Sequence, residues 1–123
     1  MLKTKDLFDF TQSLAGDYLA SFAYPWQALK GLQDEISRIG KNLPKEEYSE
    51  ISPEVWVHKS AKIAPTAYLG APCIIGKESE VRHCAFIRGS ALVGDRCVVG
   101  NSVELKNAVL FNGAQVPHFN YVG

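Results

Sequence analysis

An aliphatic residue recurs at every sixth position through the middle of the chain. These residues are Val57, Ile63, Leu69, Ile75, Val81, Ile87, Val93, Val99 and Leu105. The position four residues after each is mostly small, namely Ala61, Ala67, Cys73, Ser79, Ala85, Ala91 and Cys97, with Val103 last. A period of six matches neither the 3.6-residue repeat of an amphipathic helix nor the two-residue repeat of an open sheet. It predicts a solenoid in which each hexad forms one short strand and one corner, and three hexads close one triangular coil.

In such a coil the aliphatic side chains point inward from the strands, and small residues fill the inside of the corners. This is the hexapeptide pattern of the left-handed parallel β-helix, whose coils stack at about 4.8 Å, the spacing of hydrogen-bonded strands. We therefore predict a mainly β fold in which residues 51–123 form a left-handed β-helix. At three hexads per coil, residues 57–123 make between three and four coils.

Residues 1–50 are predicted to be helical. Apolar residues recur at helical spacing between Leu7 and Phe22, with a break near Gly16. A second helix should begin near Pro25, because proline suits the first helical turn, and should stop near Gly40. The acidic stretch 45–50 is predicted to be a solvated connection between the helices and the solenoid. Because a solenoid exposes strand edges at its ends, we expect residues 1–50 to act as a cap or packing arm, and not as a catalytic domain.

The register of the hexads breaks after Leu105. Leu110, Val116 and Val122 are again six residues apart, but Leu110 arrives one residue early. A one-residue slip changes where side chains point, as β-bulges do, and such irregularities tend to lie beside functional sites. The sequence stops at Gly123 within a repeat. We therefore expect either that the chain is a fragment, truncated at its C-terminal end, or that a partner covers this end.

Charge and cysteine content narrow the class of function. Thirteen basic and thirteen acidic residues cancel, which predicts no nucleic-acid or membrane partner and confines any anion site to a local cluster. No signal peptide or membrane-spanning stretch is evident, so we expect a cytoplasmic protein. Cys73 and Cys97 occupy small inward positions and are expected to be buried free thiols, whereas Cys84 is off the register and should be more accessible. No disulfide framework or zinc knuckle is indicated.

Three cations, Arg82, Arg88 and Lys106, occupy the position directly after an aliphatic residue. Arg88 and Lys106 are eighteen residues apart, so they should lie one above the other on adjacent coils. Stacked like charges repel unless an anion, an acid or solvent lies between them. Two interpretations remain open: the side chains diverge into water, or they clamp a phosphate. His118 follows the slip, and a single histidine of this kind can be structural as well as catalytic.

Two short runs give a more selective pattern. Val103-Glu104-Leu105-Lys106 is followed by His118-Phe119-Asn120-Tyr121-Val122-Gly123, with twelve residues from Lys106 to His118 and thirty from Arg88 to His118. Residues 55–123 thereby resemble the acetyltransferase half of the bacterial bifunctional enzyme that makes UDP-N-acetylglucosamine, which has VExK and HxxYxG elements at this spacing. The layout also resembles that of the shorter UDP-N-acetylglucosamine pyrophosphorylase-related proteins, in which a helical arm replaces the nucleotidyl domain.

The resemblance implies an N-acetyltransferase of the hexapeptide-repeat family in UDP-N-acetylglucosamine biosynthesis. His118 would be the general base that deprotonates the amine of glucosamine 1-phosphate, since an imidazole exchanges protons near neutral pH. Glu104 would orient His118, Arg88 and Lys106 would hold the sugar phosphate, and Tyr121 would contact the substrate. The family's enzymes are homotrimers with active sites between subunits, and the same assembly is expected here.

The resemblance also implies acetyl-CoA as the acyl donor, with most of its binding site beyond Gly123. Residues 1–123 alone are therefore expected not to catalyse acetyl transfer. Nothing in residues 1–50 resembles the Gly-rich nucleotide loop of the uridyltransferase half, so nucleotidyltransferase activity is not expected.

Two alternatives remain. One is a γ-type carbonic anhydrase, whose zinc needs three converging histidines; His83 and His118 are thirty-five residues apart, near two coils, but His58 is a poor third. The other is a non-catalytic trimeric module that binds a sugar phosphate or a sugar nucleotide. Further hexads and paired asparagines downstream of Gly123 would favour the transferase, and a stop codon there would favour the module.

Overall fold

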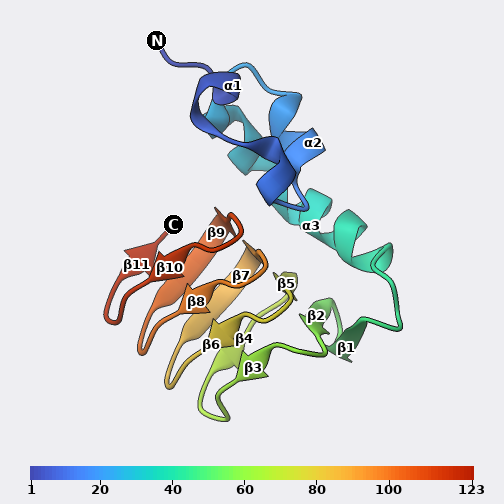
Figure 1. The fold of residues 1–123 in the computed structure, drawn as a ribbon, viewed down its shortest axis with the longest axis vertical. Coiled ribbons are helices and arrows are strands. Elements are labelled where there is room, and N and C mark those ends of the chain that lie inside the picture. The colour runs from blue at the N-terminus through green and yellow to red at the C-terminus, as the bar shows by residue number, and fades with distance from the viewer.

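The hexad residues form the interior of a parallel β-solenoid. A computed structural model describes residues 1–123 and shows a mainly β chain, with stacked coils in about four turns and a short helical segment (Figure 1). The strands are β1 (Tyr48–Ser52), β2 (Val55–His58), β3 (Lys62–Ile63), β4 (Tyr68–Leu69), β5 (Cys73–Ile75), β6 (Glu80–Val81), β7 (Phe86–Val93), β8 (Val98–Val99), β9 (Glu104–Leu110), β10 (Gln115–Val116) and β11 (Tyr121–Val122).

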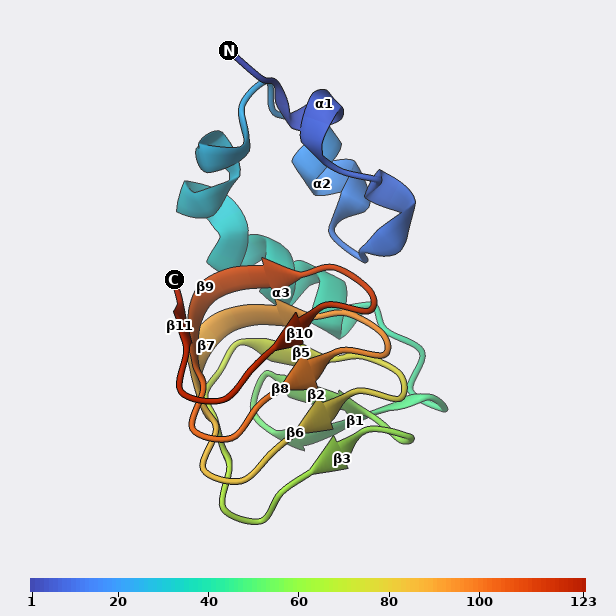
Figure 2. The same cartoon turned by 60° about the vertical axis from the view of Figure 1, so that its left-hand side comes forward.

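The coils present three faces, visible in the oblique view of Figure 2. We call them the helix-covered face (β2, β5 and residues 91–93 and 108–110), the charged face (β3, β6, β8 and β10) and the aromatic face (β4, residues 86–87 and 104–105, and β11). The long strands β7 and β9 bend round one corner and so contribute to two faces. Neighbouring strands of the coils are parallel, and in the first three coils each residue pairs with one eighteen positions later, as Cys73 does with Ala91.

The core confirms the hexad prediction. Its buried cluster contains most of the predicted aliphatic residues and the small residues of the corners, among them Ile75, Val81, Ile87, Ala91 and Val99. Ile63 and Leu69 pack against this cluster but are only partly buried. Their strands, β3 and β4, each pair with a strand of the next coil only, so their other edges are not covered by a further coil.

The predicted slip is present, and the pairing of β7 with β9 locates it. Ile87 pairs with Leu105, eighteen positions on, but the next pair is Gly89 with Lys106, seventeen positions on. Later pairs keep the shorter spacing, including Val99 with Val116. Arg88 is therefore the additional residue of the irregularity, and it has no partner in β9.

The N-terminal segment is a series of short helices. These are α1 (Thr4–Leu7), the 3₁₀ helix η1 (Phe10–Gln12), α2 (Gly16–Ala20), the 3₁₀ helix η2 (Pro25–Gly31) and α3 (Leu32–Lys41). Pro25 begins η2, as predicted for a proline in the first turn. Gly16 begins α2 instead of only interrupting a helix. A side chain there would collide with the backbone carbonyl of Phe10, because a Cβ would lie 1.9 Å from that oxygen.

The acidic stretch before the solenoid is not a simple connection. Residues 48–52 form β1, which pairs antiparallel with β2, so Tyr48 lies opposite His58 and Glu50 opposite Trp56. The prediction of a solvated connection is therefore wrong for these residues. The side chains of β1 are mostly exposed, which explains why the sequence carries little hydrophobic signal for a strand.

Helix α3 fixes the helical segment to the solenoid. Its apolar stripe, Leu32, Ile36 and Ile39, packs with the outward side chains of the helix-covered face, Trp56, Ile74 and Leu92, in a second buried cluster. The repeated aliphatic residues of the coils face the other way, into the first cluster. The helices thus cover a side face of the solenoid, and Figure 2 shows α3 running across β5, β7 and β9.

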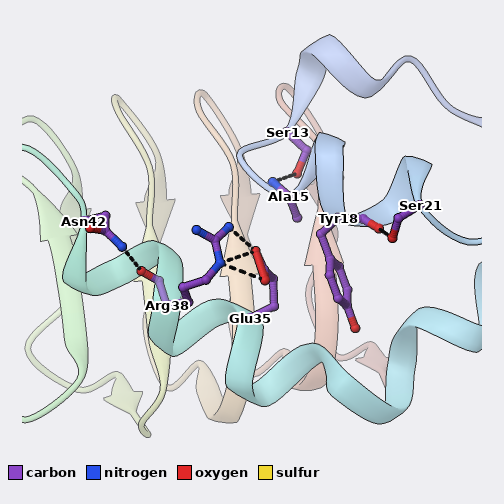
Figure 3. Close-up of polar contacts among 7 residues, drawn as sticks. All are labelled: Ser13, Ala15, Tyr18, Ser21, Glu35, Arg38 and Asn42. Carbon is purple, nitrogen blue, oxygen red and sulfur yellow. Dashed lines mark hydrogen bonds and ion pairs between the residues drawn. The ribbon is translucent and has the colours of Figure 1, made fainter.

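Local polar contacts fix the short helices, as Figure 3 shows. The Ser13 hydroxyl accepts a hydrogen bond from the Ala15 amide, and Ser21 donates to the Tyr18 carbonyl. In α3, Arg38 forms an ion pair with Glu35, and the Asn42 side chain donates to the Arg38 carbonyl, which would otherwise lack a partner at the helix end.

Gly40 provides a test of the contact between α3 and the solenoid. Replacing a glycine inside an exposed helix with alanine would raise the free energy of unfolding by about 1 kcal/mol. A Cβ at Gly40, however, would lie 2.1 Å from the Trp56 ring. We expect Gly40→Ala to lower the free energy of unfolding by about 1–3 kcal/mol, measured by urea denaturation. The exposed Gln33→Ala serves as the control. A Gly40→Ala protein as stable as the parent would contradict this packing.

Stability should fall at alkaline pH because two groups hold their protons in the folded state. Burial raises the pKa of the Cys73 thiol to about 12, and burial, assisted by the charges of Asp95 and Glu47, raises the pKa of Tyr48 to about 12. The unfolded chain releases these protons at lower pH, so the free energy of unfolding is fully retained below about pH 9 and declines towards pH 12. Urea denaturation under reducing conditions should show this decline, and Cys73→Ala should flatten it. An equal decline in that variant would contradict the assignment.

Candidate functional site

The aromatic face carries an exposed column of in-register side chains. Tyr68 pairs with Phe86, Phe86 with Glu104, and Glu104 with Tyr121, so these four residues follow one another along the solenoid. The Tyr68 and Phe86 rings meet edge to face with centroids 5.5 Å apart. Tyr121 is 59% exposed. Parallel pairing therefore gathers two of the predicted site residues, Glu104 and Tyr121, at consecutive positions on an open surface.

Arg88 lies beside this column, and its side chain forms an ion pair with that of Glu104. Its Nη1 donates to Glu104 Oε2 at 3.0 Å, with both side chains partly exposed. The prediction that Arg88 stacks directly over Lys106 is wrong, because the slip sets Lys106 opposite Gly89 instead. An acidic group, and not a second cation, is thus the neighbour of Arg88 across the coils. Lys106 is exposed and forms no ion pair.

His118 lies in the turn between β10 and β11, at the corner where the charged and aromatic faces meet. The residue is exposed, and its ring meets Phe119 edge to face with centroids 5.4 Å apart. Its imidazole makes no hydrogen bond within the chain, and the carboxylate of Glu104, its expected orienting group, accepts a hydrogen bond from Arg88. The ring nitrogens of His118 are therefore open to a ligand.

On the charged face His118 borders a polar hollow of about 260 Å³, lined also by Arg82, Asn101 and Gln115. Arg82 is not fully free, because its Nε donates to Glu80 at 3.1 Å. The amides of Asn101 and Gln115 supply donors and acceptors. The sequence indicates Arg82 only as a cation after an aliphatic residue, because Arg82 and His118 lie on different coils and no motif spans them.

A second polar group on the same corner was not predicted. His83 Nδ1 lies 2.8 Å from Thr66 Oγ1, and His83 Nε2 lies 3.3 Å from the Sγ of the exposed Cys84. Thr66 and Cys84 are eighteen residues apart, so the coil repeat is the signal in the sequence that sets these two residues side by side. The predicted state of the cysteines is confirmed, with Cys73 and Cys97 buried and all three free.

The histidines do not converge. His58 contacts Ser60 at 2.8 Å and Glu47 at 3.7 Å on a different corner, away from His83 and His118. No group of three or more His, Cys, Asp or Glu side chains is placed to hold a metal ion. The three histidines of one chain therefore form no three-histidine group among themselves.

No protein-family model matches the chain, and no curated protein matches its sequence. None of its helices is long and apolar enough to cross a membrane.

The pairing of Arg88 with Glu104 should contribute little to folding. The two side chains are 44% and 34% exposed, and exposed ion pairs contribute at most about 1 kcal/mol. We expect Arg88→Gln to lower the free energy of unfolding by less than about 1 kcal/mol, as measured by urea denaturation, with Glu104→Gln as the matched variant. A loss several times larger would show that Arg88 is structural and not available to a ligand.

Proposed function

We propose that the chain is an acyl-CoA-dependent N-acetyltransferase that acts on an amino-sugar phosphate resembling glucosamine 1-phosphate, in nucleotide-sugar synthesis. The observation that carries the proposal is the position of His118, exposed at one corner of the aromatic face, which carries Tyr121 and is followed along the chain by Arg88 and Lys106. The β-solenoid and the sequence resemblance support it. As parts of the same proposal, the solenoid is left-handed and the protein acts as a cytoplasmic homotrimer.

Arg88 and Lys106 form the proposed phosphate site in a different way from a stacked clamp. Arg88 donates one hydrogen bond to Glu104. Its guanidinium has further N–H donors in a fixed plane that suits phosphate oxygens. Lys106 adds a second charge from the next coil. Glu104 then acts as a positioning residue that holds the Arg88 guanidinium, which replaces the orienting role towards His118 expected from the resemblance.

The exposed Tyr121 ring supplies an apolar surface for the sugar. An aromatic ring offers a flat face to the C–H groups of a pyranose and a hydroxyl for hydrogen bonding. Because Tyr121 directly follows Glu104 in the column, a sugar packed on its ring would have its phosphate near Arg88. This geometry favours a phosphorylated sugar over a neutral one.

His118 is the proposed general base. As the sugar nitrogen attacks the carbonyl carbon of the acetyl thioester, the new C–N bond forms, the C–S bond breaks and CoA leaves as a thiolate. His118 accepts the proton that the amine loses and can pass it to that thiolate. Acetyl-CoA supplies the activated acetyl group. The hollow on the charged face presents Arg82, Asn101 and Gln115 as hydrogen-bonding groups on the opposite side of His118 from the aromatic face.

Binding and transfer are tested separately. Calorimetric titration should show that glucosamine 1-phosphate binds, that unphosphorylated glucosamine binds at least about tenfold more weakly, and that Arg88→Gln removes this preference, since about 1.4 kcal/mol is a factor of ten. In the full-length protein, His118→Asn should lower the release of CoA thiol by about 100-fold or more while leaving sugar-phosphate affinity nearly unchanged. No preference for the phosphorylated sugar would refute the proposal.

The second candidate is a non-catalytic module that binds a sugar phosphate or sugar nucleotide. It is favoured by one observation, namely that Glu104 bonds to Arg88 and leaves His118 without an orienting partner. This candidate predicts the same preference for phosphorylated sugar but no acetylated product in the full-length protein. Detection of N-acetylated sugar phosphate by mass spectrometry therefore decides between the two.

A further inference from the structure

We propose that Thr66, His83 and Cys84 form a reactive-thiol site that exchanges with small disulfides bearing carboxylate groups. The site lies on the same corner column as His118 but on earlier coils, and it uses none of the residues proposed for acetyl transfer. Its three side chains come from two turns, Pro65–Thr66 and His83–Cys84, which the coil register sets side by side.

The contacts match the arrangement of a nucleophile, a base and a group that orients the base. Cys84 Sγ lies 3.3 Å from His83 Nε2, within the range for a sulfur hydrogen bond. The other ring nitrogen, Nδ1, lies 2.8 Å from Thr66 Oγ1. The threonine oxygen is itself fixed, because it accepts the Cys84 backbone N–H at 3.0 Å. Thr66 therefore holds both the imidazole and the backbone that carries the thiol.

The environment of Cys84 differs from that of the other two cysteines. Cys73 is completely buried, and burial raises the pKa of its thiol to about 12. Cys97 is also buried, and its Sγ lies 3.2 Å from the Phe111 carbonyl. Cys84 is the exposed cysteine, and it has an imidazole in contact with its sulfur. The chain thus provides two internal controls for any reagent that reaches only surface thiols.

The surface beside His83 indicates the charge of the reagent. A hollow of about 290 Å³ on the charged face is lined by His83 together with Lys62, Glu80 and Arg82. Arg82 is paired with Glu80, whereas Lys62 forms no ion pair and its ammonium remains free. A carboxylate on the reagent would find this cation beside the imidazole, which favours anionic disulfides over neutral ones.

The exchange balances without any further reactant. His83 takes the proton of the Cys84 thiol, and the thiolate attacks one sulfur of the disulfide. The Cys84–sulfur bond forms, the S–S bond of the reagent breaks, and the second half leaves as a thiolate that can accept the proton from His83. Cys84 is oxidised to a mixed disulfide, and the reagent, which is the oxidant, is reduced to a free thiol.

The test uses 5,5′-dithiobis(2-nitrobenzoate), an aromatic disulfide with two carboxylates, and follows release of its coloured thiolate. We expect one fast equivalent per native chain, assigned to Cys84 by its loss in Cys84→Ser. His83→Gln should slow this phase by about tenfold or more, whereas the matched control His58→Gln should not change it. Lys62→Gln should slow the reaction with this reagent but not with neutral 2-hydroxyethyl disulfide.

Two outcomes would overturn the inference. If His83→Gln, shown by circular dichroism to be folded, reacts at the parental rate, the contact between imidazole and sulfur is structural and the site is not a reactive thiol. If Lys62→Gln slows both reagents equally or neither, the selectivity for anionic disulfides is wrong. Glucosamine 1-phosphate binding is expected to be the same in Cys84→Ser as in the parent, so the result is independent of the proposed acetyltransferase.

Discussion

The in-register stacking of inward side chains is the constraint on which the rest of the structure depends. Each coil contributes its aliphatic residues to a single continuous core, and the same pairing orders the outward side chains into columns. Because side chains alternate between the two sides of a strand, a shift of one residue would turn core residues outward. The register therefore fixes the interior and, at the same time, the chemistry that each face presents.

The single departure from this register is placed where it does little damage to the core. The additional residue is Arg88, an exposed side chain between the buried Ile87 and Gly89, so the aliphatic ladder continues on both sides of it. The cost is a local loss of pairing with β9. The gain is that a charged side chain is freed from the column and can turn to Glu104 on the next coil. A perfectly periodic chain would have set the arginine against Lys106.

The sequence predicted the coils well because a period of six over many repeats has few structural explanations. It also predicted the slip, since Leu110, Val116 and Val122 keep their own spacing. It could not locate the additional residue, because any position between two successive inward aliphatic residues fits the pattern equally. The expected stacking of Arg88 over Lys106 assumes that the register is unbroken between these two residues, and it is not. The strand Tyr48–Ser52 was missed because its exposed side chains carry no apolar alternation. Contacts such as Thr66 with His83 depend on turn geometry that periodicity does not encode.

The antiparallel direction of β1 also affects how the solenoid can associate. A parallel coil can extend indefinitely, and an uncovered edge invites other chains to add strands. On the helix-covered face, β1 occupies the edge of β2 with the opposite polarity and turns exposed side chains such as Glu50 to solvent. A further coil of the same repeat finds no matching hydrogen-bond template there. The hairpin therefore covers one of the three strand edges at this end of the stack, and only β3 and β4 leave coil edges there to which a parallel strand could be added.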